Sequence, residues 1–345
     1  MASPATEAGL LLHPGALLAA AALSAVVTAL AIGYGRRRLL DLPGARRSHR
    51  VPTPRGGGIG IVVAVVALGF GPALATDPRA YGIALAFGAV AAIGWLDDHR
   101  PVPAAVRLAL HLAAAALVVW TVAPWWSGGT AAAWALGAAA VLAVAWSVNL
   151  HNFMDGIDGL LAMQGSFVLA VLAFALARAG ALAPAHIAAA AAVATLAFVP
   201  FNAPRAHVFM GDVGSGAIGL LAGALGLVAI ARGALDLPQV LVLGSGFVID
   251  ATATLLSRIV RGRRWHAPHR EHLYQWLARA GLGHARVTAA YLGWNLAVVA
   301  PAVYLAHALT RGRAGSVYSW AVAAAVYALG LGLWLVLKRR LAARR

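Results

Sequence analysis

The residues best suited to chemistry are a few carboxylates, amides and histidines that stand between long apolar segments. Asp97 and Asp98 are adjacent, and Asp212 follows Gly211. Adjacent carboxylates repel each other, so such a pair either takes up a proton or is held charged by a cation or by basic groups. One of them can act as a general base, or they can bind a hard cation such as Mg²⁺. The alternative is that the pair only caps a following helix.

Residues 149–160 read NLHNFMDGIDGL, in which Asn149, Asn152, Asp155 and Asp158 recur every three residues. In a helical turn this spacing gathers polar groups on one side, and at membrane depth they must face protein, water or a ligand. A polar hinge between helices is the alternative, but four Asn and Asp residues exceed what a turn requires. The motif therefore predicts a binding site.

A second motif, FNAPRAHVFMGDVGSG, brings Asn202, Phe209 and Asp212 to the start of an apolar run. Asp212 lies on permissive glycine-flanked backbone and suits a metal that carries a diphosphate. Phe209 could stack on a flat base. The glycines of GSGAIG (214–219) fit a dinucleotide pattern, but no strand precedes them, so they indicate close helix packing instead.

Two basic loops offer further groups for phosphate. The first reads SHRVPTPRGGG and contains His49 and Arg55; the second reads HAPHREH and contains His269, Arg270 and His272. Arginine gives phosphate charge-assisted hydrogen bonds. Topogenic charge would explain the arginines but not the three histidines of the second loop, for which zinc is another alternative.

Long apolar segments must position these groups. The 345 residues are 61% hydrophobic and 11% charged, with a mean hydropathy of +0.80. That composition excludes an ordinary soluble domain, and no cysteine is present for disulfides or thiolate chemistry. We predict an all-α polytopic membrane protein with one domain over residues 1–345. The predicted spans are 11–34, 57–75, 80–96, 104–122, 130–148, 159–178, 184–201, 213–231, 236–258, 287–309 and 316–337.

The distribution of charge predicts the orientation. Sorting the loops alternately places 22 of the 27 Lys and Arg residues on one side, together with seven of the eleven acidic residues. This side should be cytoplasmic, with the N terminus outside and the C terminus inside a plasma membrane. The formal net charge of +16 then reflects topology, and we expect no nucleic-acid partner. Asp250 lies alone inside a span, where structural pairing and catalysis both stay open.

SHRVPTPRGGG, GWLDD, NxxNxxDGxDGL, FNxPxxxVFMGDVGS and the His-rich loop together resemble the polyprenyl-phosphate N-acetylhexosamine-1-phosphate transferases, the glycosyltransferase 4 or MraY/WecA superfamily. The resemblance covers about residues 40–285, followed by C-terminal spans and a basic tail at 286–345. It implies a membrane enzyme that moves a sugar 1-phosphate from a UDP-N-acetylhexosamine to undecaprenyl phosphate and releases UMP. It also implies Mg²⁺, with Mn²⁺ as another candidate, and a homodimer stays open.

The resemblance also implies roles for individual residues. Asp212 becomes the metal ligand, and Asp97 and Asp98 become the lipid-phosphate or base pair. We favour direct attack with Asp97 as the candidate base, although a covalent intermediate stays open. The implied nucleotide-site residues are Asn152, Asp155, Asp158 and Phe209, and the other expected substrate-binding residues are Asn149, Asn202, His49, Arg55, His269, Arg270 and His272.

Two departures concern the choice of sugar. The muramoyl-pentapeptide branch carries three consecutive histidines where this chain reads PHREH, and a lysine where it reads His99-Arg100-Pro101. Both differences favour an N-acetylhexosamine transferase that starts O-antigen, capsule or teichoic acid synthesis, with the muramoyl-pentapeptide transferase as the alternative. A membrane transporter is the alternative from another class, but we see no inverted repeat and only one deeply placed acid.

Overall fold

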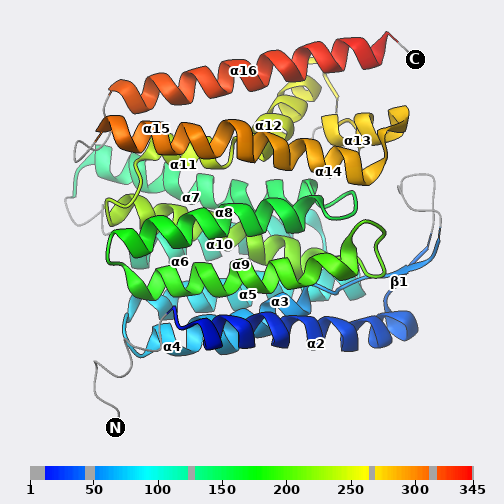
Figure 1. Ribbon diagram of the computed structural model, residues 1–345, viewed down its shortest axis with the longest axis horizontal. Helices are drawn as coiled ribbons and strands as arrows, with labels where there is room; N and C mark the ends of the chain where they lie inside the picture. Colours follow the sequence, from blue (N-terminus) through cyan, green and yellow to red (C-terminus); the bar gives the residue numbers. More distant parts are fainter. Residues whose placement is uncertain (1–11, 43–50, 123–128, 264–268, 311–316, 344–345) are drawn as a thin grey trace.

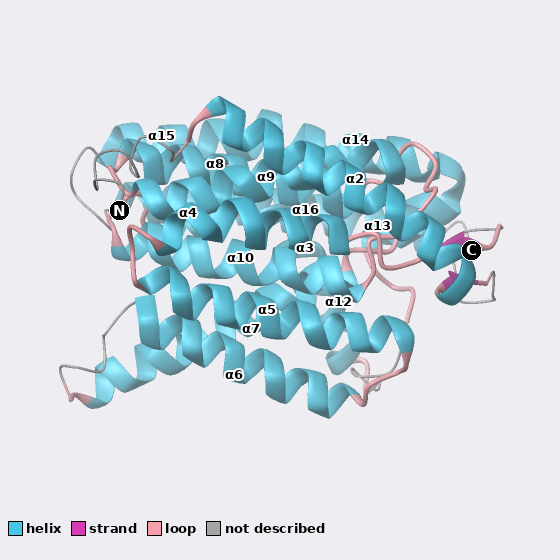
Figure 2. Ribbon diagram, turned by 90° about the horizontal axis from the view of Figure 1, so that it is seen from below, coloured by secondary structure: helices cyan, strands magenta, loops and turns pink. Residues whose placement is uncertain are grey.

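The computed structural model describes residues 12–42, 51–122, 129–263, 269–310 and 317–343. Most of its helices lie side by side along one common direction (Figures 1 and 2). In chain order the elements are α2 (Pro14–Arg38), β1 (Leu40–Asp41), β2 (Thr53–Pro54), α3 (Ile59–Ala64), the π-helical turn η1 (Val65–Phe70), α4 (Gly71–Leu74), α5 (Arg79–His99), α6 (Ala104–Val122), α7 (Ala131–Phe153), α8 (Leu160–Arg178), α9 (Leu182–Asn202), α10 (Asp212–Ala231), α11 (Leu237–Leu243), α12 (Ser245–Val260), α13 (Leu273–Leu277), η3 (Ala278–Leu282), α14 (Gly283–Trp294), η4 (Asn295–Val299), α15 (Ala300–Thr310) and α16 (Val317–Ala342).

The helices confirm an all-α polytopic membrane protein, but they do not confirm eleven spans. Within the described residues, nine helices are long and apolar enough to cross a membrane, or ten if a bent pair counts as one span. The predicted span 57–75 is the short helix Ile59–Leu74. At 1.5 Å per residue it rises about 24 Å, less than the roughly 30 Å of a hydrocarbon core.

The predicted span 236–258 is the bent pair: α11 and α12 meet at Gly244 at an angle of 79°. The small residues Ser245 and Gly246 follow the bend and leave room for the side chain of Trp294. The Trp294 indole N–H donates to the Ser245 hydroxyl at 3.1 Å. A Cβ on Gly246 would lie 3.4 Å from the Trp294 ring. The predicted span 287–309 instead belongs to a longer, interrupted helical run that starts at Leu273.

Helix α10 is the centre of the bundle. It packs on α5, α7 and α8, and 89% of the residues in its most apolar 18-residue stretch are buried. A Cβ on Gly214 would lie 2.8 Å from the Cα of Gly58, and one on Gly219 would lie 2.8 Å from the Cα of Val148. These contacts confirm that the GSGAIG glycines serve close helix packing.

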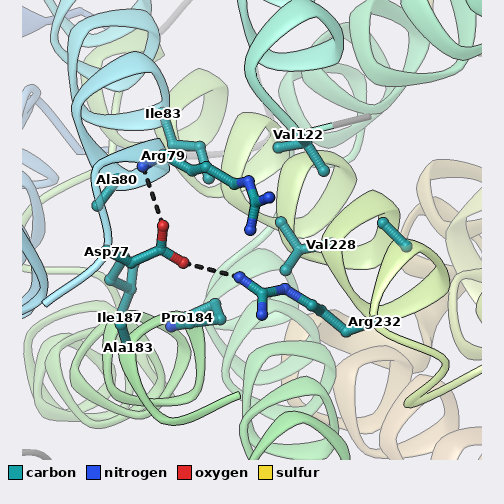
Figure 3. Close-up of a pocket in the computed structure, with 11 residues that line it drawn as sticks. Asp77, Arg79, Ala80, Ile83, Val122, Ala183, Pro184, Ile187, Val228 and Arg232 are labelled. Atoms are coloured by element: carbon teal, nitrogen blue, oxygen red, sulfur yellow. Dashed lines mark hydrogen bonds and ion pairs between the residues drawn. The ribbon is translucent and has the colours of Figure 1, made fainter. Parts of the chain in front are cut away.

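Helices α5 and α10 run in opposite directions between the two ends of the bundle. The end of α5 and the start of α10 carry the Asp97, Asp98 and Asp212 carboxylates. At the other end, Asp77 accepts from the Arg79 backbone N–H at 3.0 Å and from the Arg232 guanidinium at 2.9 Å, beside a small crevice (Figure 3). Helices of about 20 residues are about 30 Å long, so the two ends lie a membrane thickness apart.

Candidate functional site

Three carboxylates and two guanidinium groups form one cluster at the first of these ends. The Arg55 Nε lies 2.7 Å from an oxygen of Asp98, and its Nη2 pairs with Asp212. The Arg107 Nη1 lies 2.6 Å from Asp97 and 2.8 Å from the other oxygen of Asp212. Asp212 is therefore shared by both arginines, and the repulsion between the three carboxylates is offset by two positive charges.

Backbone hydrogen bonds fix the acidic pair. Asp98, whose side chain is 0% exposed, accepts from the N–H groups of Asp212 at 3.0 Å and Val213 at 3.1 Å. It thus caps α10 rather than the helix that follows it in sequence. Gly211 has φ +77°, and a Cβ there would lie 2.5 Å from Asp98, so this position needs glycine. Asp97 accepts from the Val102 N–H at 2.7 Å, just before α6.

Arg55 reaches the cluster from a glycine-rich segment that lies along residues 209–210. The Phe209 N–H donates to the Pro54 carbonyl at 2.8 Å, and the Gly57 N–H donates back to the Phe209 carbonyl at 2.9 Å. Burial alone would lower the pKa of Arg55, but the charges of Asp212 and Asp98 outweigh burial and the net pKa is raised. Arg55 therefore remains a permanent cation. Phe209 is half-buried beside it, as a base-stacking residue would need to be.

The NLHNFMDGIDGL motif contributes to the same end. Asn152 donates to the Ser215 hydroxyl of α10 at 3.1 Å. Burial raises the pKa of Asp155 well above its ordinary value, although the charge of Arg55 acts in the opposite direction. Burial therefore favours the protonated form of Asp155. The Asn149 amide donates to the Ala145 carbonyl at 2.7 Å and lies against His111 of α6.

Asn202 and Asp158 hold the loops around the cluster. Asn202 is buried, accepts from the Gly159 N–H at 2.8 Å and donates to the Val208 carbonyl at 2.9 Å. Both ends of its amide bind backbone, which favours a structural role over direct substrate contact. Asp158 lies 3.1 Å from the His284 ring nitrogen and accepts from the Ala206 N–H at 3.3 Å.

The described end of the HAPHREH segment, His269–His272, lies beside the NLHNFMDGIDGL motif at Phe153. The His272 ring stacks on Phe153 with centroids 6.3 Å apart, and the His269 and His272 rings are 4.9 Å apart. Burial, with the charges of His272 and Arg258, lowers the pKa of His269 to about 4, so this ring is neutral at pH 7. His266, the third histidine of this loop, lies outside the described residues, and in the described segments no three His, Cys, Asp or Glu residues are placed to hold a metal. His49 lies outside the described residues.

The match to a known family covers the Asp97–Asp98 pair, the NLHNFMDGIDGL motif and Asp212. A family model described as glycosyl transferase family 4 matches residues 80–230. Over 318 residues, the chain is 32% identical to the decaprenyl-phosphate N-acetylglucosaminephosphotransferase of Mycobacterium tuberculosis (strain ATCC 25618 / H37Rv), with 79% of this chain and 78% of the relative covered. This chain belongs to glycosyl transferase family 4. The resemblance predicted from the motifs is confirmed, and the protein is a sugar-1-phosphate transferase.

Two further relatives come from different branches of the family. The probable undecaprenyl-phosphate N-acetylglucosaminyl 1-phosphate transferase of Bacillus subtilis (strain 168) is 26% identical over 279 residues, which cover 78% of this chain and 76% of the relative. The phospho-N-acetylmuramoyl-pentapeptide-transferase of Synechococcus elongatus (strain ATCC 33912 / PCC 7942 / FACHB-805) is 30% identical over 295 residues, with 74% and 76% covered. Both branches of the family are therefore represented among the relatives.

Sequence reasoning missed Arg107 in this family 4 site. The motifs do not include Arg107, which is one of the 22 basic residues sorted to the cytoplasmic side, yet it bridges Asp97 and Asp212. The available signal was its position: Arg107 lies in the first turn of α6, shortly after the DDHRPVP segment that connects α5 to α6. An arginine in this turn is close enough in sequence to reach back to the acidic pair, as Arg107 does.

The donor set fits one kind of metal site. Mg²⁺ is usually bound through one or two carboxylates and keeps waters and phosphate oxygens as its other ligands. Asp212, with Asp97 or Asp98 beside it, can supply such a site when a diphosphate is present. A closed protein cage is not what these residues offer, in keeping with the lack of a three-ligand group in the described residues.

Proposed function

We propose that this enzyme transfers N-acetylglucosamine 1-phosphate from UDP-N-acetylglucosamine to undecaprenyl or decaprenyl phosphate and releases UMP. The observation that carries the proposal is the Arg55–Asp98–Asp212–Arg107–Asp97 cluster at one membrane end, in a chain whose relatives are named for this transfer. A polyprenyl lipid reaches such a position from the bilayer and a nucleotide reaches it from water. The site end is proposed to be cytoplasmic, because it carries the excess of Lys and Arg.

The reaction exchanges one diphosphate for another, so it needs no separate energy source. An oxygen of the lipid phosphate attacks the β-phosphorus of the UDP-sugar, the bond from that phosphorus to the bridging oxygen breaks, and UMP leaves with the bridging oxygen. Catalysis of this kind rests on positioning and on charge neutralisation. Arg55 and Arg107 are the groups proposed to offset the negative charge of the two phosphate substrates.

Asp97 is the candidate base for direct attack. Its side chain is 13% exposed and is held by a single arginine, whereas Asp98 is fully buried and caps α10. A phosphate monoester has a second pKa near 6, so most lipid phosphate is already a dianion at pH 7. The base would take up the proton of the remaining fraction.

Asp212 is proposed to hold Mg²⁺, or Mn²⁺ in its place, together with phosphate oxygens. An ion bound there would neutralise charge on the diphosphate and on the departing UMP. The Asn152–Asp158 segment and Phe209 are proposed to face the nucleotide, since they lie next to the cluster on its loop side.

A second candidate is the transfer of phospho-N-acetylmuramoyl-pentapeptide, which the Synechococcus elongatus relative favours. The PHREH sequence and the lack of a lysine directly after the Asp pair oppose it. Here the basic partner of Asp97 is Arg107, nine residues beyond the pair.

UMP release from a panel of substrates tests the proposal. The purified protein in detergent is given UDP-N-acetylglucosamine, UDP-N-acetylgalactosamine or UDP-N-acetylmuramoyl-pentapeptide, each with undecaprenyl or decaprenyl phosphate and Mg²⁺. We expect UMP and a lipid product with UDP-N-acetylglucosamine. UMP only with the pentapeptide donor would establish the second candidate. Sugar uptake by the same protein reconstituted into liposomes, with no release of UMP, would indicate a transporter.

A further inference from the structure

Asp250 is a deeply buried carboxylate on α12 that the reaction does not use. It is 1% exposed. Its five hydrogen-bond donors are the Leu273 N–H at 2.7 Å, the Tyr274 N–H at 3.2 Å, the Tyr291 hydroxyl at 2.8 Å, the Trp334 indole at 3.1 Å and the Thr254 hydroxyl at 3.3 Å. A buried carboxylate is costly unless its oxygens are satisfied, and here they are satisfied by groups from four helices.

The two backbone donors show what this network fixes. Leu273 and Tyr274 form the first turn of α13, so Asp250 binds the free N–H groups at the start of that helix. The side chains of Tyr291 on α14 and Trp334 on α16 hold the carboxylate from the other side. Asp250 therefore connects the start of α13 to α14 and α16 and fixes its position relative to them.

Tyr274 connects α13 to the NLHNFMDGIDGL motif. Its side chain is fully buried, and its hydroxyl donates to the Phe153 carbonyl at 2.9 Å. A Cβ on Gly156 would lie 2.1 Å from the Tyr274 oxygen, so the turn that follows α7 is pressed directly against this ring. Asp155 lies between the two contacted residues.

We propose that Asp250 and Tyr274 are positioning residues: Asp250 sets the start of α13, and the Tyr274 hydroxyl sets the Phe153–Asp158 turn for the nucleotide. The proposal rests on the proposed assignment of the UDP-sugar to that turn. Neither residue needs to touch a substrate. A turn held in one geometry before binding loses less freedom when the substrate arrives, so weakening the contact should raise the KM of the nucleotide substrate.

Tyr274→Phe tests the contact, because it removes the hydroxyl and keeps the ring. Tyr327→Phe is its matched control: the Tyr327 hydroxyl also donates to a backbone carbonyl, that of Leu241, at 2.8 Å, but it joins α16 to α11 away from the turn. We expect Tyr274→Phe to raise the KM for UDP-N-acetylglucosamine about 3- to 10-fold and to leave the KM for polyprenyl phosphate unchanged. Tyr327→Phe should change neither KM.

Gly156→Ala gives a second readout that a general loss of stability would not imitate. In the native chain the new Cβ meets the Tyr274 oxygen at 2.1 Å, whereas without that oxygen the nearest ring atoms lie at 3.0 Å and 3.1 Å. Gly156→Ala should therefore lower kcat/KM about tenfold or more alone, and clearly less when combined with Tyr274→Phe. Trp334→Phe removes one donor from Asp250 and should raise the same KM by a smaller factor.

The outcomes separate this proposal from the proposed function. Equal effects of Gly156→Ala in both backgrounds, or unchanged KM values in Tyr274→Phe, would overturn the role of Tyr274. An unchanged KM in Trp334→Phe would remove Asp250 from the proposal. Non-additive effects on the KM of polyprenyl phosphate would support positioning but overturn the nucleotide assignment. If no donor gave UMP, the same double-mutant cycle would be measured by thermal unfolding, where additivity would overturn the contact.

Discussion

At the scale of residues, the site is a balance of three carboxylates against two guanidinium groups. The two arginines engage Asp212 differently. Arg55 uses two nitrogens, Nε on Asp98 and Nη2 on Asp212, whereas Arg107 uses one nitrogen for both Asp97 and Asp212. The first contact depends on the planar fork of arginine, and the second needs only one positive centre.

This difference predicts different responses to lysine. Arg55→Lys should lower kcat/KM about 10- to 100-fold, because an ammonium group cannot reproduce the contacts of two guanidinium nitrogens. Arg107→Lys should retain activity within about threefold, because one ammonium can bridge the two carboxylates. Steady-state kinetics of both variants and of the two alanine variants measure this. Equal losses in the two lysine variants would show that the fork geometry is not what distinguishes the arginines.

Asp212→Asn should lower turnover about 10²- to 10³-fold and weaken the response to Mg²⁺, because a neutral amide is a poor ligand for a hard cation. The matched control is Asp77→Asn, the same change in the ion pair at the opposite membrane end. Mg²⁺ titrations of both variants, with thermal unfolding to check folding, measure the effect. A folded Asp212→Asn enzyme with near-normal turnover would reject Asp212 as the metal ligand.

At the scale of elements, the site depends on the close approach of α5 and α10. A Cβ on Gly94 of α5 would lie 2.4 Å from the Asp212 carbonyl oxygen, whereas Gly88 on the same helix has no atom within 4 Å. Gly94→Ala should therefore destabilise the protein by about 1–3 kcal/mol and displace Asp212. Gly88→Ala should be neutral or slightly stabilising. Thermal unfolding in detergent compares them, and equal Tm values would show that the helices can separate without cost.

The sequence predicted some features of these helices and not others. Apolar length predicted the helices, and the position of the NLHNFMDGIDGL and FNAPRAHVFMGDVGSG motifs between apolar segments placed Asn152, Asp155 and Asp212 at helix ends. The bend at Gly244 was not predicted, because a run of apolar residues has the same composition whether the helix is straight or broken. The capping of α10 by Asp98 and the role of Asp250 depend on contacts between helices distant in sequence, which spacing alone does not reveal.

At the scale of the whole molecule, the account requires the carboxylate end to face the cytosol, where UDP-sugars are found. Helix α2 starts at the end of the bundle opposite to that at which α16 finishes (Figure 1). Together with the 22 basic residues sorted to the site side, this arrangement predicts an inside C terminus.

Single-cysteine labelling tests the orientation cleanly, because the chain has no cysteine of its own. Ala179 and Arg261 are exposed and follow α8 and α12, which end on opposite sides. In intact cells, or in spheroplasts if an outer membrane is present, an impermeant maleimide should label Ala179→Cys at once. Arg261→Cys should react only after the membrane is permeabilised. The reverse pattern would contradict the assignment of the site to the cytosolic face.

In the proposed reaction the sugar moves together with its phosphate, and labelled phosphorus can follow this transfer. UDP-N-acetylglucosamine carrying ³²P in the β-phosphate is incubated with the enzyme and undecaprenyl phosphate, and the lipid and aqueous products are separated. We expect the label to enter the lipid with the sugar, while the aqueous product is unlabelled UMP. Labelled UDP in water, with unlabelled sugar on the lipid, would show that the glycosidic bond is broken instead and would contradict the account.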